Sequence, residues 1–123
     1  MIVGIGVDIA EVERIAAALA HPTRGQRFRA KVFTPAEIAY CERRRHAAQS
    51  YAARFAAKEA VMKALGAFVP WREVEVVRSD QGPPRVQLSG RAAKRAEELK
   101  IRRWSLSLTH TNNLALAWVV AEA

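Results

Sequence analysis

The sequence has little of what marks several common classes of protein. It contains one cysteine, Cys41, so an intrachain disulfide is excluded and a reducing compartment such as the cytoplasm is favoured. No apolar run approaches the ~20 residues that a membrane span needs. The first residues, MIVGIGVD, carry no basic segment and reach an aspartate early, unlike a signal peptide. We therefore expect a cytoplasmic protein that does not enter the membrane.

Several catalytic motifs are also missing. There is no glycine-rich phosphate loop of the Walker type, no Cys/His metal spacing and no Gly-x-Ser-x-Gly turn. Gly4-Ile5-Gly6 is too short for a dinucleotide-binding fingerprint. Half of the residues are hydrophobic, and 123 residues fit one domain with one core. We expect a single domain that covers residues 1–123.

Acidic residues are few compared with basic ones, and the net charge is +8. Residues 24–54 alone hold eight basic and two acidic side chains, a net charge of +6. Such a surface attracts an anionic partner, which could be nucleic acid, an acidic protein or a phosphorylated small molecule. The basic stretch lacks interleaved aromatic residues and matches no standard nucleic-acid-binding motif. A basic nucleic-acid-binding module is therefore the alternative rather than the first hypothesis.

The hydrophobic pattern predicts an α+β fold, with antiparallel strands packed around a long helix. A helix that begins at Asp8 should end near His21-Pro22, because the residue before proline avoids the helical region. Thr34 and Glu37 form a capping-box pattern, and Gly66 is a typical residue after a helix end. Helices are expected at 34–44, 48–65 and 89–100, strands at 2–7, 73–78, 85–88, 104–109 and 114–121, and turns at 80–84 and 111–113.

Asp8 is a candidate metal ligand, because it stands where a strand passes into a helix. It is also a good helix N-cap, with Glu11 in the capping-box position. The two roles are compatible, since a carboxylate can direct one oxygen to a cation.

Glu59 lies on the long helix with mainly apolar neighbours one turn away, apart from Lys63. The pair could be an ordinary Glu–Lys contact of a solvated helix face. Together with Asp8 it could also form a site for a polyphosphate, since Mg²⁺ takes one or two carboxylates and completes its shell with water and phosphate oxygens. Lys63 could then offset the charge on a leaving phosphate. This second interpretation requires Asp8 and Glu59 to meet in space.

His110 follows an alternating strand in the segment Ser-Leu-Thr-His-Thr. A single histidine in a hairpin is usually structural or exposed. The hydroxyl groups of Ser107 and Thr109 beside it make phosphate binding the other possibility.

Three segments at this spacing carry a family resemblance: GIGVDIAEVERI at 4–15, RFAAKEAVMKALG at 54–66 and SLSLTHT at 105–111. Residues 27–41 fit the same pattern. Together they resemble the holo-acyl-carrier-protein synthase family, the short class of phosphopantetheinyl transferases. These enzymes move the phosphopantetheine arm of coenzyme A to a serine of an acyl carrier protein, for fatty acid or polyketide synthesis.

The resemblance implies a role for each candidate residue. Asp8 and Glu59 would hold the Mg²⁺ that binds the pyrophosphate of coenzyme A. Glu59 would accept the serine proton, directly or through a water, and Lys63 would stabilise the departing adenosine 3',5'-bisphosphate. Arg54 and His110 would hold the nucleotide phosphates.

The resemblance also implies a homotrimer with sites between subunits. The carrier would dock on Arg14 and on basic residues of the following stretch, including Arg24, Arg27 and Arg45. The sequence departs from the family pattern at 67–71, which is shorter and poorer in glycine, and lacks the acidic residue that often follows the histidine.

Overall fold

The computed structural model describes residues 1–78 and 82–123. The turn expected at 80–84 falls partly on residues 79–81, outside the described ranges. The elements follow in the order β1 (Ile2–Glu11), α1 (Val12–Ala20), α2 (Gly25–Val32), α3 (Pro35–Glu42), α4 (Ala47–Leu65), a short 3₁₀ helix η1 (Trp71–Glu73), β2 (Val74–Val77), β3 (Arg85–Leu88), α5 (Gly90–Glu98), β4 (Arg103–His110) and β5 (Leu114–Glu122).

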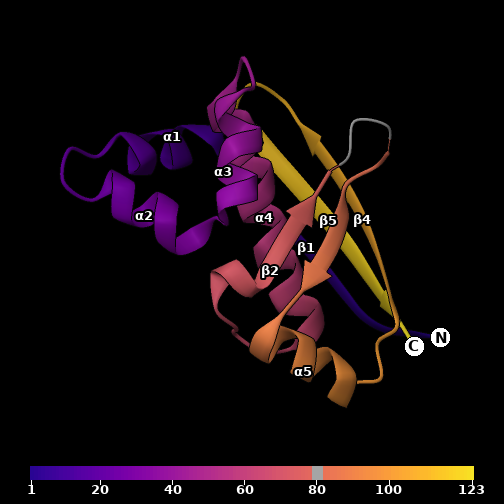
Figure 1. The fold of residues 1–123 in the computed structure, drawn as a ribbon. Coiled ribbons are helices and arrows are strands. Elements are labelled where there is room, and N and C mark those ends of the chain that lie inside the picture. The colour runs from indigo at the N-terminus through magenta and orange to yellow at the C-terminus, as the bar shows by residue number, and fades with distance from the viewer. Residues whose placement is uncertain (79–81) are drawn as a thin grey trace.

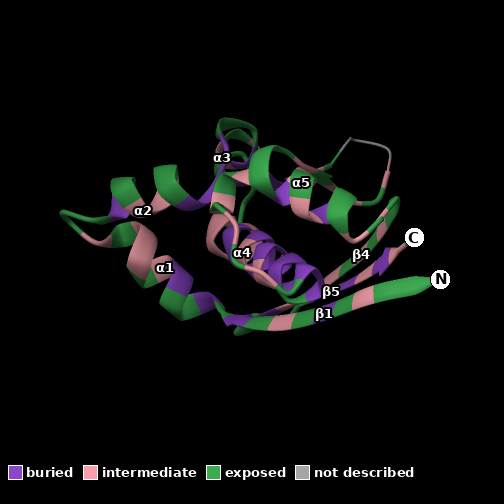
Figure 2. Cartoon of the chain, turned by 90° about the horizontal axis from the view of Figure 1, so that it is seen from below, coloured by how far each residue is buried: buried purple, intermediate pink, exposed green. Residues whose placement is uncertain are grey.

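The long helix α4 lies at the centre of the molecule, between two layers. On one side is an antiparallel sheet with strand order β1-β5-β4, and on the other are α3, α5 and the β2–β3 hairpin (Figure 1). Seen from below, α4 is largely buried around its circumference, as expected for a helix covered on several sides (Figure 2). This confirms the α+β fold that the sequence predicted. No helix in the described ranges is long and apolar enough to cross a membrane.

Two glycines bring β1 unusually close to α4. A Cβ at Gly6 would lie 1.8 Å from the carbonyl oxygen of Ala60, and one at Gly4 would lie 2.4 Å from that of Ala64. No other residue type fits at such distances, so the backbones of strand and helix are in direct contact. Because side chains alternate along a strand, Asp8 shares the inward face of β1 with these glycines.

The opposite face of the sheet is apolar and exposed. Ile5 is 56% exposed, Ile9 57% and Trp118 of β5 53%. A strand face exposed to water normally carries polar residues, and contiguous apolar patches on a protein surface mark interaction sites. This outer sheet face is therefore a candidate contact surface.

A buried ion pair joins α4 to the other layer. Lys58 Nζ lies 2.8 Å from Glu37 Oε1, and neither side chain is exposed. Glu37 also accepts hydrogen bonds from the backbone N–H groups of Thr34 and Val76, and Lys58 donates to two backbone carbonyls. Burial lowers the pKa of Lys58, while Glu37 opposes that shift. The capping box at Thr34 and Glu37 is confirmed, and its carboxylate also stabilises the core.

One expectation about local structure is wrong, and one helix was not predicted. Asp8 does not cap a helix, because β1 continues to pair with β5 as far as Glu11 opposite Leu114; Glu11 is the N-cap and makes no side-chain capping bond. Helix α2 was not expected, because its basic sequence shows little apolar periodicity, with Phe28 and Val32 among its few apolar residues. The other helices and strands agree with expectation to within a few residues.

Candidate active site

Asp8 and Glu59, far apart in the sequence, line one cavity of about 330 Å³. Asp8 projects from β1 and Glu59 from the middle of α4, and the close contact of these elements brings them together. Lys63 Nζ lies 3.0 Å from Asp8 Oδ1 and donates a second hydrogen bond, 2.9 Å long, to the carbonyl of Val7. The three candidate residues thus form one cluster.

The carboxylates of this cluster repel each other. Burial raises the pKa of Glu59, and the neighbouring carboxylate of Asp8 raises it further, whereas Lys63 lowers it. A cation placed between two such carboxylates removes the repulsion. In the described ranges no group of three or more His, Cys, Asp or Glu side chains could hold a metal. Two carboxylates without a third protein ligand suit Mg²⁺, which keeps waters and takes phosphate oxygens.

A second cavity, of about 410 Å³, opens from the same cluster. Glu59 and Lys63 line one part of it, and Met62, Phe68 and Trp71 make the rest largely apolar. Phe68 is 98% exposed, so its ring stands free at the rim. The 67–71 segment that departs from the family pattern therefore borders the carboxylate cluster.

Arg54 and His110 line a separate basic cavity of about 480 Å³, together with Arg44 and Arg45. Arg54 is only 4% exposed, and its guanidinium lies 4.1 Å from the centre of the Tyr40 ring. Within the described ranges its Nε has no hydrogen-bond partner and its charge has no carboxylate partner. A buried cation without a counter-charge is costly, and an anionic ligand offsets that cost.

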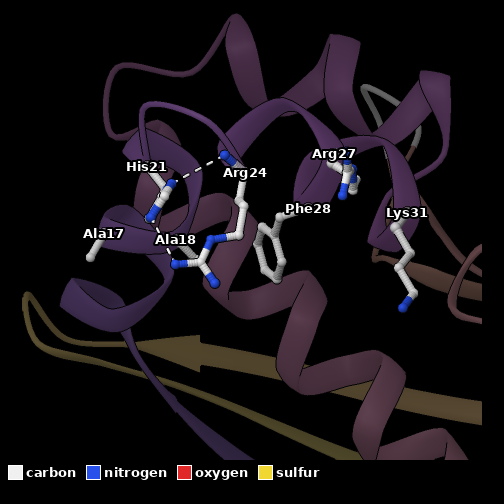
Figure 3. A pocket seen from close by; sticks show the side chains of 7 residues that line it. All are labelled: Ala17, Ala18, His21, Arg24, Arg27, Phe28 and Lys31. Atoms are coloured by element: carbon white, nitrogen blue, oxygen red, sulfur yellow. Dashed lines mark hydrogen bonds between the residues drawn. The ribbon is translucent and has the colours of Figure 1, made fainter.

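A groove of about 540 Å³ separates α1 from α2 (Figure 3). Its lining combines an apolar floor with a basic rim and consists of Ala17, Ala18, His21, Arg24, Arg27, Phe28 and Lys31.

The four arginines expected to dock a carrier are not in one place. Arg24 and Arg27 share this groove, and Arg14 is exposed on α1 and lines the Asp8–Glu59 cavity. The structure does not bring Arg45 to the groove but to the basic cavity with Arg54.

Several residues of the basic cavity were not singled out from the sequence, among them Tyr40, His46 and Arg78. The run of three arginines before His46 was a usable signal, because three consecutive basic side chains concentrate positive charge. Arg78 comes from the end of β2, and only the fold brings it to this place.

Comparison with known protein families shows which class of protein this chain belongs to. Residues 4–119 match the family model "4'-phosphopantetheinyl transferase superfamily", which is most of the chain, so the chain belongs to that superfamily. The family that the sequence resembled is thereby confirmed.

The particular family follows from individual relatives. A holo-[acyl-carrier-protein] synthase of Anaeromyxobacter dehalogenans is 49% identical, over 99% of this chain and 97% of its own length. The crystal structure of holo-[acyl-carrier-protein] synthase from Neisseria meningitidis has a TM-score of 0.87 at 35% identity and covers 100% of both chains. A Bacillus anthracis synthase in complex with coenzyme A (3',5'-ADP) has a TM-score of 0.79 at 32% identity, over 100% of this chain and 98% of that one. Within the superfamily, the chain is therefore an enzyme of the holo-[acyl-carrier-protein] synthase family.

Proposed function

We propose that the chain transfers the phosphopantetheine group of coenzyme A to a serine of an apo acyl carrier protein in a Mg²⁺-dependent reaction. The observation that carries this proposal is the convergence of Asp8, Glu59 and Lys63 at the contact of β1 with α4. The complex of the Bacillus anthracis relative with coenzyme A supports the choice of donor.

The residues of the cluster divide the chemistry between them. Asp8 and Glu59 would hold Mg²⁺, which when bound supplies positive charge to the pyrophosphate of coenzyme A. The serine oxygen attacks the phosphorus that bears pantetheine, and the bond from that phosphorus to adenosine 3',5'-bisphosphate breaks. Glu59, whose pKa is raised by burial and by Asp8, accepts the serine proton directly or through a water. Lys63, whose side chain is about half exposed, stabilises the leaving phosphate.

The basic cavity is the proposed site for the nucleotide phosphates. Arg54 supplies a buried charge that no carboxylate of residues 1–78 or 82–123 pairs with, and His110 and Arg45 add donors around the same space. We assign Arg45 to this role, because its position separates it from the groove that contains Arg24.

The groove between α1 and α2 is the proposed docking surface for the carrier. Its basic rim, which includes Arg24 and Arg27, complements an acidic helix, and the floor formed with Phe28 accepts apolar side chains. Arg14 extends the basic surface from the groove to the cavity of Asp8, the proposed place of transfer.

We propose that copies of the chain assemble through the outer sheet face into the homotrimer that the resemblance implies. Arg54 and Glu59 are five residues apart on α4, about 140° around its axis, and line different cavities. A coenzyme A molecule that contacts both the basic cavity of Arg54 and the cavity of Glu59 is more readily held between two copies of the chain than within one. Light scattering with Ile5→Glu tests this, because a charge on that face should give monomers with little activity.

The alternative, a basic nucleic-acid-binding module, gains no support from the comparisons, which return transferases of the same length. The basic residues of the 24–54 stretch that line cavities are also divided between two of them, with Arg24, Arg27 and Lys31 in the groove and Arg43, Arg44, Arg45 and Arg54 in the basic cavity. The cytoplasmic location stays a prediction from the single cysteine, and the natural carrier stays open.

Intact-mass spectrometry of an apo carrier tests the proposed function. The carrier, incubated with the enzyme, coenzyme A and Mg²⁺, should gain the mass of one phosphopantetheine group. EDTA should abolish the gain, and added Mg²⁺ should restore it. An unchanged carrier mass under all these conditions would contradict the proposal, and a gain that persists in EDTA would contradict its metal dependence.

A further inference from the structure

His21 lies in the turn between α1 and α2 and accepts hydrogen bonds from the backbone of that turn. Nδ1 of His21 accepts hydrogen bonds from the backbone N–H groups of Thr23 and Arg24, at 3.2 and 3.1 Å. The backbone carbonyl of His21 accepts a further bond from the N–H group of Gly25 at 3.0 Å. A Cβ at Gly25 would lie 2.2 Å from the carbonyl oxygen of Leu19, so the backbone of this turn packs directly on α1. The His21 ring thus fixes the segment that carries Arg24.

The second ring nitrogen faces the same arginine. Nε2 of His21 lies 3.1 Å from Nη2 of Arg24, which folds back over the ring (Figure 3). A neutral imidazole accepts a hydrogen bond at one nitrogen, whereas an imidazolium accepts at neither. Because Nδ1 accepts the backbone N–H groups, the neutral ring carries its proton on Nε2, and the contact with Nη2 of Arg24 is not a hydrogen bond. Protonation of the ring removes the acceptor at Nδ1 and places two cations side by side.

The groups that line the groove around His21 are basic or apolar. Helix α2 presents Arg24, Arg27 and Lys31 to the groove, and α1 presents Ala17 and Ala18. Of the residues that the structure describes, no carboxylate forms an ion pair with the ring.

We propose that His21 is a positioning residue of the carrier-docking groove, whose unprotonated ring holds Arg24 in place for an acidic carrier. The KM for the carrier then rises when this ring gains a proton, because its acceptor nitrogen is lost. This inference rests on the proposed function of the groove as a docking surface.

A second effect has the opposite sign. A protonated His21 adds a positive charge to the groove, which attracts an acidic partner. An exposed charge pair changes affinity by about fivefold at most, and less in salt. Each of the hydrogen bonds to Nδ1 is worth about two- to twelvefold in an equilibrium. We therefore expect the loss of the held conformation to be the larger effect.

Two substitutions separate the hydrogen bonds from the charge. In His21→Asn the amide oxygen can accept the same backbone N–H groups as Nδ1, but the side chain does not titrate. His21→Ala removes the acceptor. Near pH 8 we expect His21→Ala to raise the carrier KM by about threefold to tenfold, and His21→Asn to recover most of that loss.

The decisive measurement is the KM for the carrier and for coenzyme A between about pH 8 and pH 5.5. In the unmodified enzyme the carrier KM should rise by about threefold to tenfold more than the coenzyme A KM, and in His21→Asn this excess should vanish. A carrier KM that falls with pH, or an identical pH profile in His21→Asn, overturns the proposal.

A readout without catalysis keeps this inference distinct from the proposed function. The amide NMR signals of Thr23 and Arg24 should shift with pH in the unmodified chain and remain fixed in His21→Asn. If no carrier is modified at any pH, the proposed function fails. If these amide signals do not titrate, the role of His21 fails whatever the enzyme does.

Discussion

Helix α4 carries the lysines of two lysine–carboxylate pairs, five residues apart, and the pairs differ in how completely their charges are satisfied. Lys58 and Glu37 are both fully buried, 2.8 Å apart, and surrounded by further hydrogen-bond partners. Lys63 and Asp8 are 3.0 Å apart, with side chains 55% and 13% exposed, and Glu59 adds a second carboxylate to them.

The difference separates a structural ion pair from a reactive cluster on one helix. The ammonium of Lys58 directs its three donors to Glu37 and to the carbonyls of Trp71 and Val74, and the pair connects α4 to the opposite layer. The Lys63 cluster has an excess carboxylate and opens into two cavities. A charge that the fold leaves unsatisfied is available for binding and chemistry.

The largest effect should come from breaking the satisfied pair. Lys58→Met leaves the Glu37 carboxylate buried without its cation, which should lower the free energy of unfolding by about 3–5 kcal/mol. Urea denaturation measures it, with exposed Lys94→Met as the matched control, expected within about 0.5 kcal/mol of the unmodified chain. A stability equal to that of the control would show that the pair is dispensable.

The open cluster should respond in activity instead. Glu59→Gln keeps the shape of the side chain but removes a metal ligand and proton acceptor, so kcat should fall by at least about 100-fold, equivalent to about 2.7 kcal/mol. Stability should stay the same or rise, because the repulsion from Asp8 is removed. Circular dichroism checks the fold. Turnover at the unmodified rate would refute both roles of Glu59.

Arg54 extends this comparison, since it is buried like Lys58 but forms no ion pair with any residue that the structure describes. Arg54→Gln should raise the KM for coenzyme A by about tenfold with little change in stability. A thermal-shift titration with adenosine 3',5'-bisphosphate should show weaker stabilisation of this variant, while exposed Arg91→Gln behaves as the unmodified chain. Equal stabilisation of both variants would place the nucleotide elsewhere.

The smallest effect is expected at the surface. Arg14→Glu reverses one exposed charge between the docking groove and the carboxylate cluster, and should raise the KM for the carrier by about fivefold. The KM for coenzyme A should change less, and the difference should shrink in high salt. Equal changes in both KM values would count against a docking role.

Local rules were enough for some of the site and not for the rest. The small apolar neighbours of Glu59 and the position of Lys63 one turn later indicated the cluster on α4, because helix geometry fixes such neighbours. The meeting of Asp8 with Glu59 depends on how closely β1 approaches α4, which no helix or strand period specifies. Helix α2 depends on tertiary contacts with α1 for its stability, so its own pattern was too weak to predict it.

Gly6 shows how a residue without chemistry can be indispensable. Gly6 has only a hydrogen atom where a Cβ would lie 1.8 Å from the carbonyl oxygen of Ala60. Any larger group would push apart β1 and α4, the two elements that carry Asp8 and Glu59. A saturation screen for transferase activity should therefore find position 6 as intolerant of substitution as the acidic positions themselves. In this molecule, a position can be intolerant of substitution because two backbones are close together there, and not only because its side chain takes part in the reaction.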